Sequence, residues 1–253
     1  MDHPEVTFLF PCLNEQQTIG ICLERVQRCA VANNLDVELL VADNGSDDHS
    51  VEIANNHGAR VVHVERRGYG AALWKGIQSA RGRFILFADA DDSYYVSQLP
   101  LFLEEMRGGG QFVIGNRFGL GVEPGAMPLL NRYVGNPVLS GIGRLLFGGN
   151  VADWHCGLRG GDRHALLGLD LRSPGMEFAS EMVAKALLDR LRIKQIPTGL
   201  RKDGRDKAPH LRPWRDGLRH LGLMFRLKGL EWCTTQSVQH STKNNSVRLK
   251  QAP

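Results

Sequence analysis

The sequence lacks any run of 18 apolar residues, which is the length that a membrane-spanning helix needs. Even the apolar stretch from 218 to 230 is broken by Arg219, His220, Arg226 and Lys228. The first five residues, Met1 to Glu5, lack the basic and apolar regions of a secretory signal. We therefore expect a cytoplasmic protein, either free or attached peripherally to the inner face of a membrane, directly or through a membrane protein.

Several common site motifs are missing as well. The 5 cysteines, at positions 12, 22, 29, 156 and 233, have neither the paired spacing of a disulfide framework nor the CxxC spacing of a zinc site. The glycine-rich segment 66–72 lacks the third glycine of the dinucleotide fingerprint and the GK[ST] ending of a P-loop. These absences count against a secreted disulfide scaffold, a dehydrogenase and an ATPase.

The chain of 253 residues, 42% of them hydrophobic, is long enough for one large α/β domain. Its net charge of +4 is too small to indicate nucleic acid as a partner, and we predict none. The basic residues are unevenly distributed, because residues 190–228 hold 12 Lys and Arg against 3 Asp. This segment is suited to anionic partners.

Apolar segments that read as strands alternate with helical patterns through the first hundred residues. The expected strands are 6–10, 37–42, 60–64 and 83–88, and the intervening helices run to about 30, from 51 to 57 and from 71 to 80. Such alternation predicts a mostly parallel central sheet with helices on both faces, and ligands beyond the carboxyl ends of its strands. Polar clusters at 11–15, 43–46 and 89–92 fall at those ends. We therefore expect three segments to converge on one crevice.

The second half has weaker signals. We expect a helix over 99–106, a strand over 111–115, a glycine-interrupted helix within 131–147, a helix over 176–191 and a strand over 193–197. Residues 1–212 would then form the catalytic domain, 213–232 a basic amphipathic helix, and 233–253 a polar tail that is predicted to be disordered. The helix would turn Trp214, Leu218, Leu221, Phe225 and Trp232 either to a membrane surface or onto its own domain; the sequence leaves both open.

Asp89 and Asp91 end the strand 83–88 with D-x-D spacing, which lets two carboxylates face one hard cation. Mg²⁺ or Mn²⁺ prefers such oxygen ligands and completes its shell with phosphate oxygens. A solvated acidic turn is the alternative. Glu15 and Asp43 end the first two strands, where they would either accept hydrogen bonds from a base or ribose, or simply cap a helix and close an Asx turn.

Four segments occur in order and carry a family resemblance: Pro11-Cys12-Leu13-Asn14-Glu15, Asp43-Asn44-Gly45-Ser46, Arg67-Gly68-Tyr69-Gly70-Ala71-Ala72 and Asp89-Ala90-Asp91. Together they resemble the family-two glycosyltransferases of the GT-A fold. Later segments resemble the dolichol-phosphate mannose synthase branch, namely Gly115 to Phe118, Asp153 to Arg159, Gly175 to Glu181, and Arg201-x-x-Gly204-x-x-Lys207. The likeness covers residues from about 6 to 228.

The resemblance implies an inverting transfer of a hexose from a GDP- or UDP-sugar to a polyprenyl phosphate, with Mg²⁺ or Mn²⁺ as cofactor. The implied metal ligands are Asp89 and Asp91. The implied donor-binding residues are Pro11, Leu13, Glu15, Asp43, Gly70, Asp89, Ala90, Asp91 and Arg117. The implied catalytic residues are Asp91, Arg117, Arg201 and Lys207, while Asp92, Asp153 and Glu177 are candidates for binding the sugar or orienting other groups.

Two positions depart from the family pattern. Asn44 replaces the second acid of the common D-D-G-S, and Asp206 stands where the family has Ser or Thr before the lysine. These departures keep two alternatives open: transfer to a soluble or other acceptor, or a nucleotide-sugar-binding protein without transfer activity. The motifs leave the sugar and the base undetermined.

Overall fold

The computed structural model describes residues 3–204 and 215–231. In these residues one eight-stranded sheet has the strand order β3-β2-β1-β4-β7-β5-β8-β6. Its strands are β1 (Val6–Cys12), β2 (Val37–Asp43), β3 (Arg60–His63), β4 (Phe84–Phe87), β5 (Phe112–Asn116), β6 (Gly121–Val122), β7 (Arg159–Asp162) and β8 (Ile193–Leu200). Strand β1 pairs in parallel with β2 and with β4, and β2 pairs in parallel with β3. Strand β8 pairs in parallel with β5 and with β6. The predicted mostly parallel sheet is thus confirmed.

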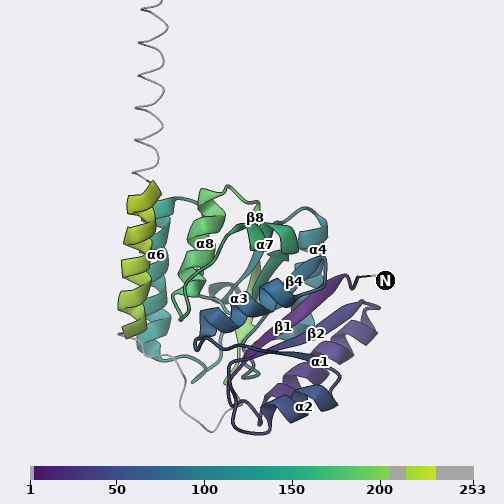
Figure 1. The fold of residues 1–253 in the computed structure, drawn as a ribbon. Helices are drawn as coiled ribbons and strands as arrows, with labels where there is room; N and C mark the ends of the chain where they lie inside the picture. The colour runs from purple at the N-terminus through teal and green to yellow at the C-terminus, as the bar shows by residue number, and fades with distance from the viewer. Residues whose placement is uncertain (1–2, 205–214, 232–253) are drawn as a thin grey trace, which may run out of the picture.

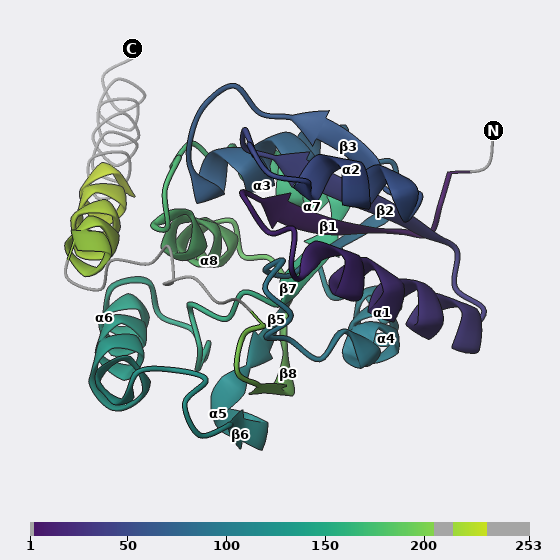
Figure 2. The ribbon, with the colours of Figure 1, turned by 90° about the horizontal axis from the view of Figure 1, so that it is seen from below.

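Helices cover both faces of the sheet (Figures 1 and 2). On one face lie α1 (Ile19–Ala32) and α4 (Leu99–Arg107), and on the other α3 (Tyr69–Ser79), α7 (Arg163–Gly168) and α8 (Phe178–Leu188). The remaining helical elements are α2 (Ser50–Asn56), η1 (Val96–Gln98), α5 (Arg117–Leu120), η2 (Asn131–Gly135), α6 (Asn136–Phe147) and a helix over 215–231. Every residue of β1 and β4 is buried, because helices cover both faces of the sheet. The sequences of these strands are therefore mostly apolar and do not alternate between apolar and polar residues.

Besides the two-residue β6, β7 is a strand that the sequence patterns did not predict. It runs antiparallel between β4 and β5, and two of its four residues are glycines. A Cβ on Gly160 would lie 2.0 Å from the carbonyl oxygen of Ile85, and one on Gly161 would lie 2.2 Å from that of Gln111. Glycine is therefore required where these backbones approach closely, although glycine is depleted in ordinary strands.

The helix over 215–231 packs on the domain with a different face from the one that its apolar spacing predicts. Its buried residues are Asp216, His220, Leu223 and Met224, whereas Leu218 and Phe225 are 70% and 59% exposed. Trp214 and Trp232, which belong to the predicted apolar face, lie outside the described residues, as does the predicted tail 233–253. The helix therefore contacts its own domain and also leaves apolar side chains exposed.

Among residues 3–204 and 215–231, we find no helix that is both long enough and apolar enough to span a bilayer.

Candidate functional site

A pocket of about 570 Å³ lies beyond the carboxyl ends of β1, β2 and β4, at the predicted crevice. Of the predicted site residues it is lined by Pro11, Leu13, Glu15, Asp89, Ala90, Asp91 and Arg117. Asp43, Gly70 and Arg201 are not among the described residues that line it, although Asn44, next to Asp43, is. Lys207 and Asp206 lie outside the described residues.

The two predicted metal ligands are held in place by hydrogen bonds from neighbouring hydroxyls. The hydroxyl of Tyr69 donates to Asp89 Oδ1 over 2.8 Å, and that of Ser93 donates to Asp91 Oδ1 over 2.6 Å. No cluster of three or more His, Cys, Asp or Glu that could hold a metal forms among residues 3–204 and 215–231. Both carboxylates line the pocket and are oxygen donors of the kind that Mg²⁺ or Mn²⁺ prefers, and their role as metal ligands stays a prediction.

Arg117 forms a buried, two-pronged ion pair with Asp153 at the pocket wall. Its Nε donates to Asp153 Oδ2 over 2.6 Å and its Nη2 to Oδ1 over 2.8 Å. Burial alone would raise the pKa of Asp153 and lower that of Arg117, but the attraction between the two outweighs it, so that the pKa of Asp153 lies below and that of Arg117 above the ordinary value. The guanidinium is therefore a permanent, oriented cation.

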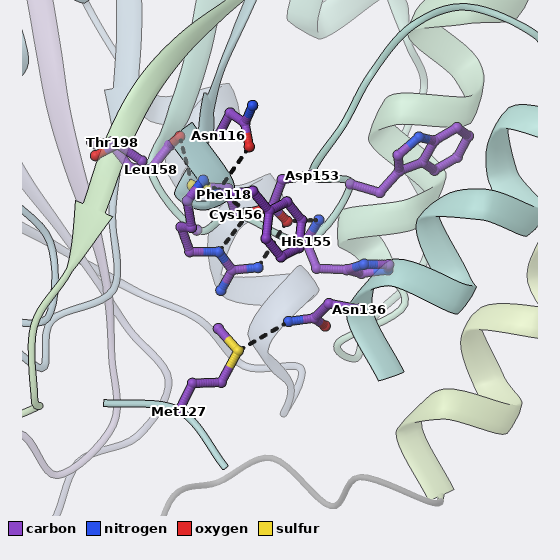
Figure 3. A network of polar contacts seen from close by, with 12 residues as sticks. Asn116, Phe118, Met127, Asn136, Asp153, His155, Cys156, Leu158 and Thr198 are labelled. Carbon is purple, nitrogen blue, oxygen red and sulfur yellow. Dashed lines mark hydrogen bonds and ion pairs between the residues drawn. The ribbon is translucent and has the colours of Figure 1, made fainter. Parts of the chain in front are cut away.

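Figure 3 shows the surroundings of this pair, with Asp153, His155 and Cys156 close to Asn116 and Phe118, where β5 ends and α5 begins. Asp153 is fully buried and also accepts a hydrogen bond from the backbone N–H of His155. Of the two alternatives for Asp153, orienting another group agrees with this geometry, because its oxygens are occupied by Arg117 and the loop.

Asp43 and Glu15 make the local contacts that an Asx turn and a helix start require. Asp43 accepts hydrogen bonds from the backbone N–H groups of Gly45 and Ser46 over 3.2 and 3.1 Å. Glu15 accepts one from the Thr18 hydroxyl, and both carboxylates are buried. Glu15 still lines the pocket, so that both its structural and its ligand-binding interpretations remain predictions.

Arg201 holds the turn that follows the D-x-D residues. It donates from Nε to the Asp92 carbonyl oxygen, from Nη2 to the Asp92 carboxylate and, over 3.1 Å, to the Tyr94 carbonyl oxygen. Asp92 adopts φ +62°, and Arg25 also pairs with its carboxylate over 3.1 Å. In this conformation the Arg201 guanidinium is engaged by the protein, and its role toward phosphate stays a prediction.

A polar chain that the motifs did not predict connects the pocket to the C-terminal helix. Ser180 of α8 hydrogen bonds to His155 Nε2 over 3.0 Å and to His220 Nδ1 over 2.7 Å. The two imidazole rings meet edge to face with centroids 4.7 Å apart, and both histidines line the pocket. Burial lowers the pKa of His155, and it lowers the pKa of His220 to about 4. His155, Ser180 and His220 lie far apart in the sequence, so no local motif predicts this contact.

Comparison with known proteins identifies the family of the chain. Residues 7–168 match the model of the family described as "Glycosyl transferase family 2". The low-salt glycan biosynthesis hexosyltransferase Agl6 of Haloferax volcanii is 36% identical over 223 residues, which are 88% of this chain and 53% of that protein. The dolichyl-phosphate hexose transferase of the same organism is 31% identical over 75% of this chain and 79% of that protein. This chain thus spans about half the length of Agl6.

A solved structure has the same fold. It is glucosyl-3-phosphoglycerate synthase of Mycobacterium tuberculosis, in complex with Mn²⁺, UDP and glucosyl-3-phosphoglycerate. It superposes with a TM-score of 0.59 at 26% identity and covers 88% of this chain and 76% of its own. The predicted GT-A architecture is confirmed. The chain belongs to glycosyl transferase family 2, in the branch that resembles dolichol-phosphate mannose synthase.

Proposed function

We propose that the chain is an inverting hexosyltransferase that moves a hexose from a GDP- or UDP-sugar to a polyprenyl phosphate, with Mg²⁺ or Mn²⁺ as cofactor. One observation carries this proposal: Asp89, Asp91 and the buried Arg117 line one pocket with Pro11, Leu13 and Glu15. These are the groups that a nucleoside diphosphate and its cation need. The UDP and Mn²⁺ of the glucosyl-3-phosphoglycerate synthase complex support the donor class.

Asp89 and Asp91 would hold the divalent cation against the diphosphate, where it neutralises charge on the leaving group. Arg117 supplies a second positive charge. Its Nε and Nη2 are used by Asp153, and Nη1 makes no hydrogen bond within the described part of the chain, so that Nη1 is the nitrogen that it can offer to a phosphate.

The acceptor chemistry removes the need for a dedicated base. A phosphomonoester is anionic at neutral pH, so its oxygen can attack the anomeric carbon while the bond from that carbon to the nucleoside diphosphate breaks, with inversion. No proton has to be removed from the nucleophile. No acid–base role is then required of Asp92 or Asp153. Asp92 pairs with Arg201 and Arg25, Asp153 pairs with Arg117, and both carboxylates orient these arginines.

Exposed apolar side chains support a lipid acceptor. They occur on two elements that touch each other, since Lys228 of the C-terminal helix lies over the ring of Phe147 at the end of α6 (Figure 1). The exposed apolar residues of these elements and the segment before α6 are Leu129, Leu130, Tyr133, Val134, Val138, Leu145, Leu218, Phe225 and Leu230. We therefore also propose that residues 213–232 form a membrane-contacting helix beside the domain 1–212. Burial of its apolar side chains in the membrane surface and attraction of Arg215, Arg219 and Arg226 to anionic lipid would both favour this contact.

The donor proposal is tested by thermal unfolding with Mn²⁺ and a panel of GDP-, UDP- and dTDP-sugars. A ligand at 100 times its Kd stabilises the fold by about 2.7 kcal/mol, which raises the melting temperature measurably. Asp91→Ala should abolish both the metal-dependent shift and transfer. Asp36→Ala serves as the matched control, because Asp36 is exposed and directly precedes β2, at the end of the strand away from the pocket. Nucleotide binding without any transfer would favour the non-catalytic alternative.

The acceptor proposal is tested by supplying radiolabelled donor with undecaprenyl phosphate, dolichyl phosphate or 3-phosphoglycerate. Label in the lipid phase supports the polyprenyl acceptor, and label only in the soluble product supports the soluble alternative. Vesicles of phosphatidylglycerol should bind the wild type, and Phe225→Asp should release it, because Phe225 is exposed and its replacement by Asp opposes both the apolar and the electrostatic attraction. Unchanged vesicle binding by this variant would refute the membrane contact.

A further inference from the structure

Two histidines that line the pocket, His155 and His220, share the hydroxyl of Ser180. This hydroxyl lies 3.0 Å from His155 Nε2 and 2.7 Å from His220 Nδ1. Ser180 is fully buried, and its hydroxyl makes no other hydrogen bond within the described part of the chain. A hydroxyl has only one proton to donate. Ser180 therefore donates to one imidazole and accepts a hydrogen bond from the other.

The remaining nitrogen of the His155 ring decides which imidazole receives the proton. His155 Nδ1 is buried and makes no hydrogen bond among residues 3–204 and 215–231. A buried N–H without an acceptor is rarer in proteins than a buried acceptor without a donor, so Nδ1 has no proton. Burial lowers the pKa of both rings, so that both are neutral at pH 7.5. His155 thus has its proton on Nε2 and donates it to Ser180.

The proton of His220 is placed by the same chain of contacts. Because Ser180 accepts from His155, its own proton goes to His220 Nδ1, and the proton of the neutral His220 ring is then on Nε2. His220 Nε2 makes no hydrogen bond with the described residues, but it is not fully buried as His155 Nδ1 is. His220 is 5% exposed and lines the pocket, so Nε2 is the ring nitrogen that a ligand there can reach.

The surroundings of this N–H favour an anionic ligand. His220 belongs to the helix over 215–231, and Arg215 and Arg219 of the same helix also line the pocket. Both arginines are exposed, and Arg219 pairs with Glu177 over 3.3 Å. The same helix has the exposed side chains of Leu218 and Phe225, which belong to the proposed membrane contact. The phosphate of an acceptor is the anion that would approach along this helix.

We propose that His220 Nε2 donates a hydrogen bond to a phosphate oxygen of the acceptor, and that Ser180 and His155 are the positioning residues that keep the proton on this nitrogen. A neutral donor orients the phosphate without adding a positive charge, so the attacking oxygen keeps more of its negative charge than it would beside a cation. This inference rests on the proposed function, because it assigns an acceptor contact in the same pocket. A polyprenyl phosphate and a soluble phosphomonoester share the chemistry that this contact recognises.

The first test determines which ring nitrogens have protons in the full chain at pH 7.5, by nuclear magnetic resonance of the imidazole nitrogens. We expect the proton on Nε2 in both His155 and His220. A proton on His220 Nδ1, or a charged His220 ring, would overturn the proposal. Ser180→Ala should give a mixture of the two neutral forms of His220, and an unchanged proton position in this variant would overturn the positioning role of Ser180.

The second test follows the His220 Nε2 resonance during titration with farnesyl phosphate, with farnesol as the probe that lacks a phosphate. Farnesyl phosphate should shift this resonance, and farnesol should leave it in place. Equal shifts with both probes would overturn the proposal, because they would show contact with the lipid chain and not with the phosphate. The absence of a shift with either probe would overturn it as well.

The third test compares KM values for undecaprenyl phosphate and 3-phosphoglycerate. His220→Asn removes the group at Nε2 and should raise the KM for the acceptor by about tenfold or more, with the KM for the donor sugar unchanged. His220→Gln has an amide N–H that can reach the position of Nε2 and should restore most of the loss. His164→Asn, at an exposed histidine of α7, is the matched control and should have the KM values of the wild type. The acceptor whose KM responds identifies the source of the phosphate.

These measurements distinguish failure of the contact from failure of the proposed function. If the wild type transfers hexose to neither acceptor, the proposed function fails and this inference fails with it. If the wild type transfers hexose and His220→Asn has an unchanged KM for both acceptors, only the inference fails. Equal increases in the KM for donor and acceptor, without rescue by His220→Gln, would also overturn it, because they would indicate a general disturbance of the pocket.

Discussion

Acidification should destabilise this protein through the buried imidazole of His220. Burial lowers the pKa of His220 to about 4; Asp216 opposes this shift, while Arg159 and Arg219 reinforce it. The ring is 5% exposed, shares a hydrogen bond with the Ser180 hydroxyl, and meets the His155 ring edge to face. A proton on this ring would therefore be poorly solvated in the folded state.

The magnitude follows from the difference between the folded and unfolded pKa. In the unfolded chain a histidine has a pKa of about 6.5, so between pH 6.5 and about 4 the unfolded state binds more protons than the folded one. The free energy of unfolding must then fall as the pH falls through this window. For His220 alone the loss between pH 7.5 and pH 5 is about 2 kcal/mol.

Urea unfolding at pH 7.5 and pH 5 measures this loss. His220→Asn keeps a hydrogen-bonding group near Ser180 and removes the titration, so its loss of unfolding free energy should be smaller than that of the wild type by about 2 kcal/mol. His164→Asn replaces an exposed histidine of α7 and should lose as much as the wild type. Equal losses for the wild type and His220→Asn, or a nuclear magnetic resonance titration of His220 with a midpoint near 6.5, would refute the reasoning.

Three further substitutions test the packing around the pocket. Arg117→Ala leaves the buried carboxylate of Asp153 unpaired and should cost about 3–5 kcal/mol in urea unfolding, whereas combining it with Asp153→Asn should recover part of that loss; no recovery would contradict an uncompensated charge as the cause. Gly160→Ala places a methyl group against the Ile85 carbonyl oxygen and should cost about 1–3 kcal/mol or prevent folding; wild-type stability would contradict the close approach of β4 and β7. Arg201→Ala should raise the Mn²⁺ concentration needed for nucleotide binding, measured by calorimetry, because it releases the turn that carries Asp91; an unchanged requirement would leave Arg201 without this role.

The first half of the fold could be predicted from sequence because its strands are buried on both faces. Continuous apolar runs such as Phe8 to Phe10 and Phe84 to Phe87 identify such strands, and the polar residues after them mark the ligand edge of the sheet. The D-x-D pair was found for the same reason, since Asp89 and Asp91 closely follow β4, whereas Arg117 was identified only by the resemblance of residues 115–118 to a family motif. Motif order then identified the family.

The tertiary structure alone decided the rest. The Arg159–Asp162 strand cannot be predicted from its composition. Its glycines are required because the carbonyl oxygens of Ile85 and Gln111 lie too close for a Cβ, and not because of any local preference. The sequence likewise shows that Asn44 departs from the usual acid, but only the structure shows that its side-chain amide hydrogen bonds to the backbone of Arg66 and of Gly68.

Local propensity and motif spacing therefore determined the strands β1 to β5 and β8, the pocket edge and the positions of the two carboxylates in the chain. The arginines were different, because a guanidinium has five donors and its role depends on which acceptors the fold brings to it. Arg117 pairs with Asp153 and Arg201 pairs with Asp92, across sequence separations that no local pattern encodes.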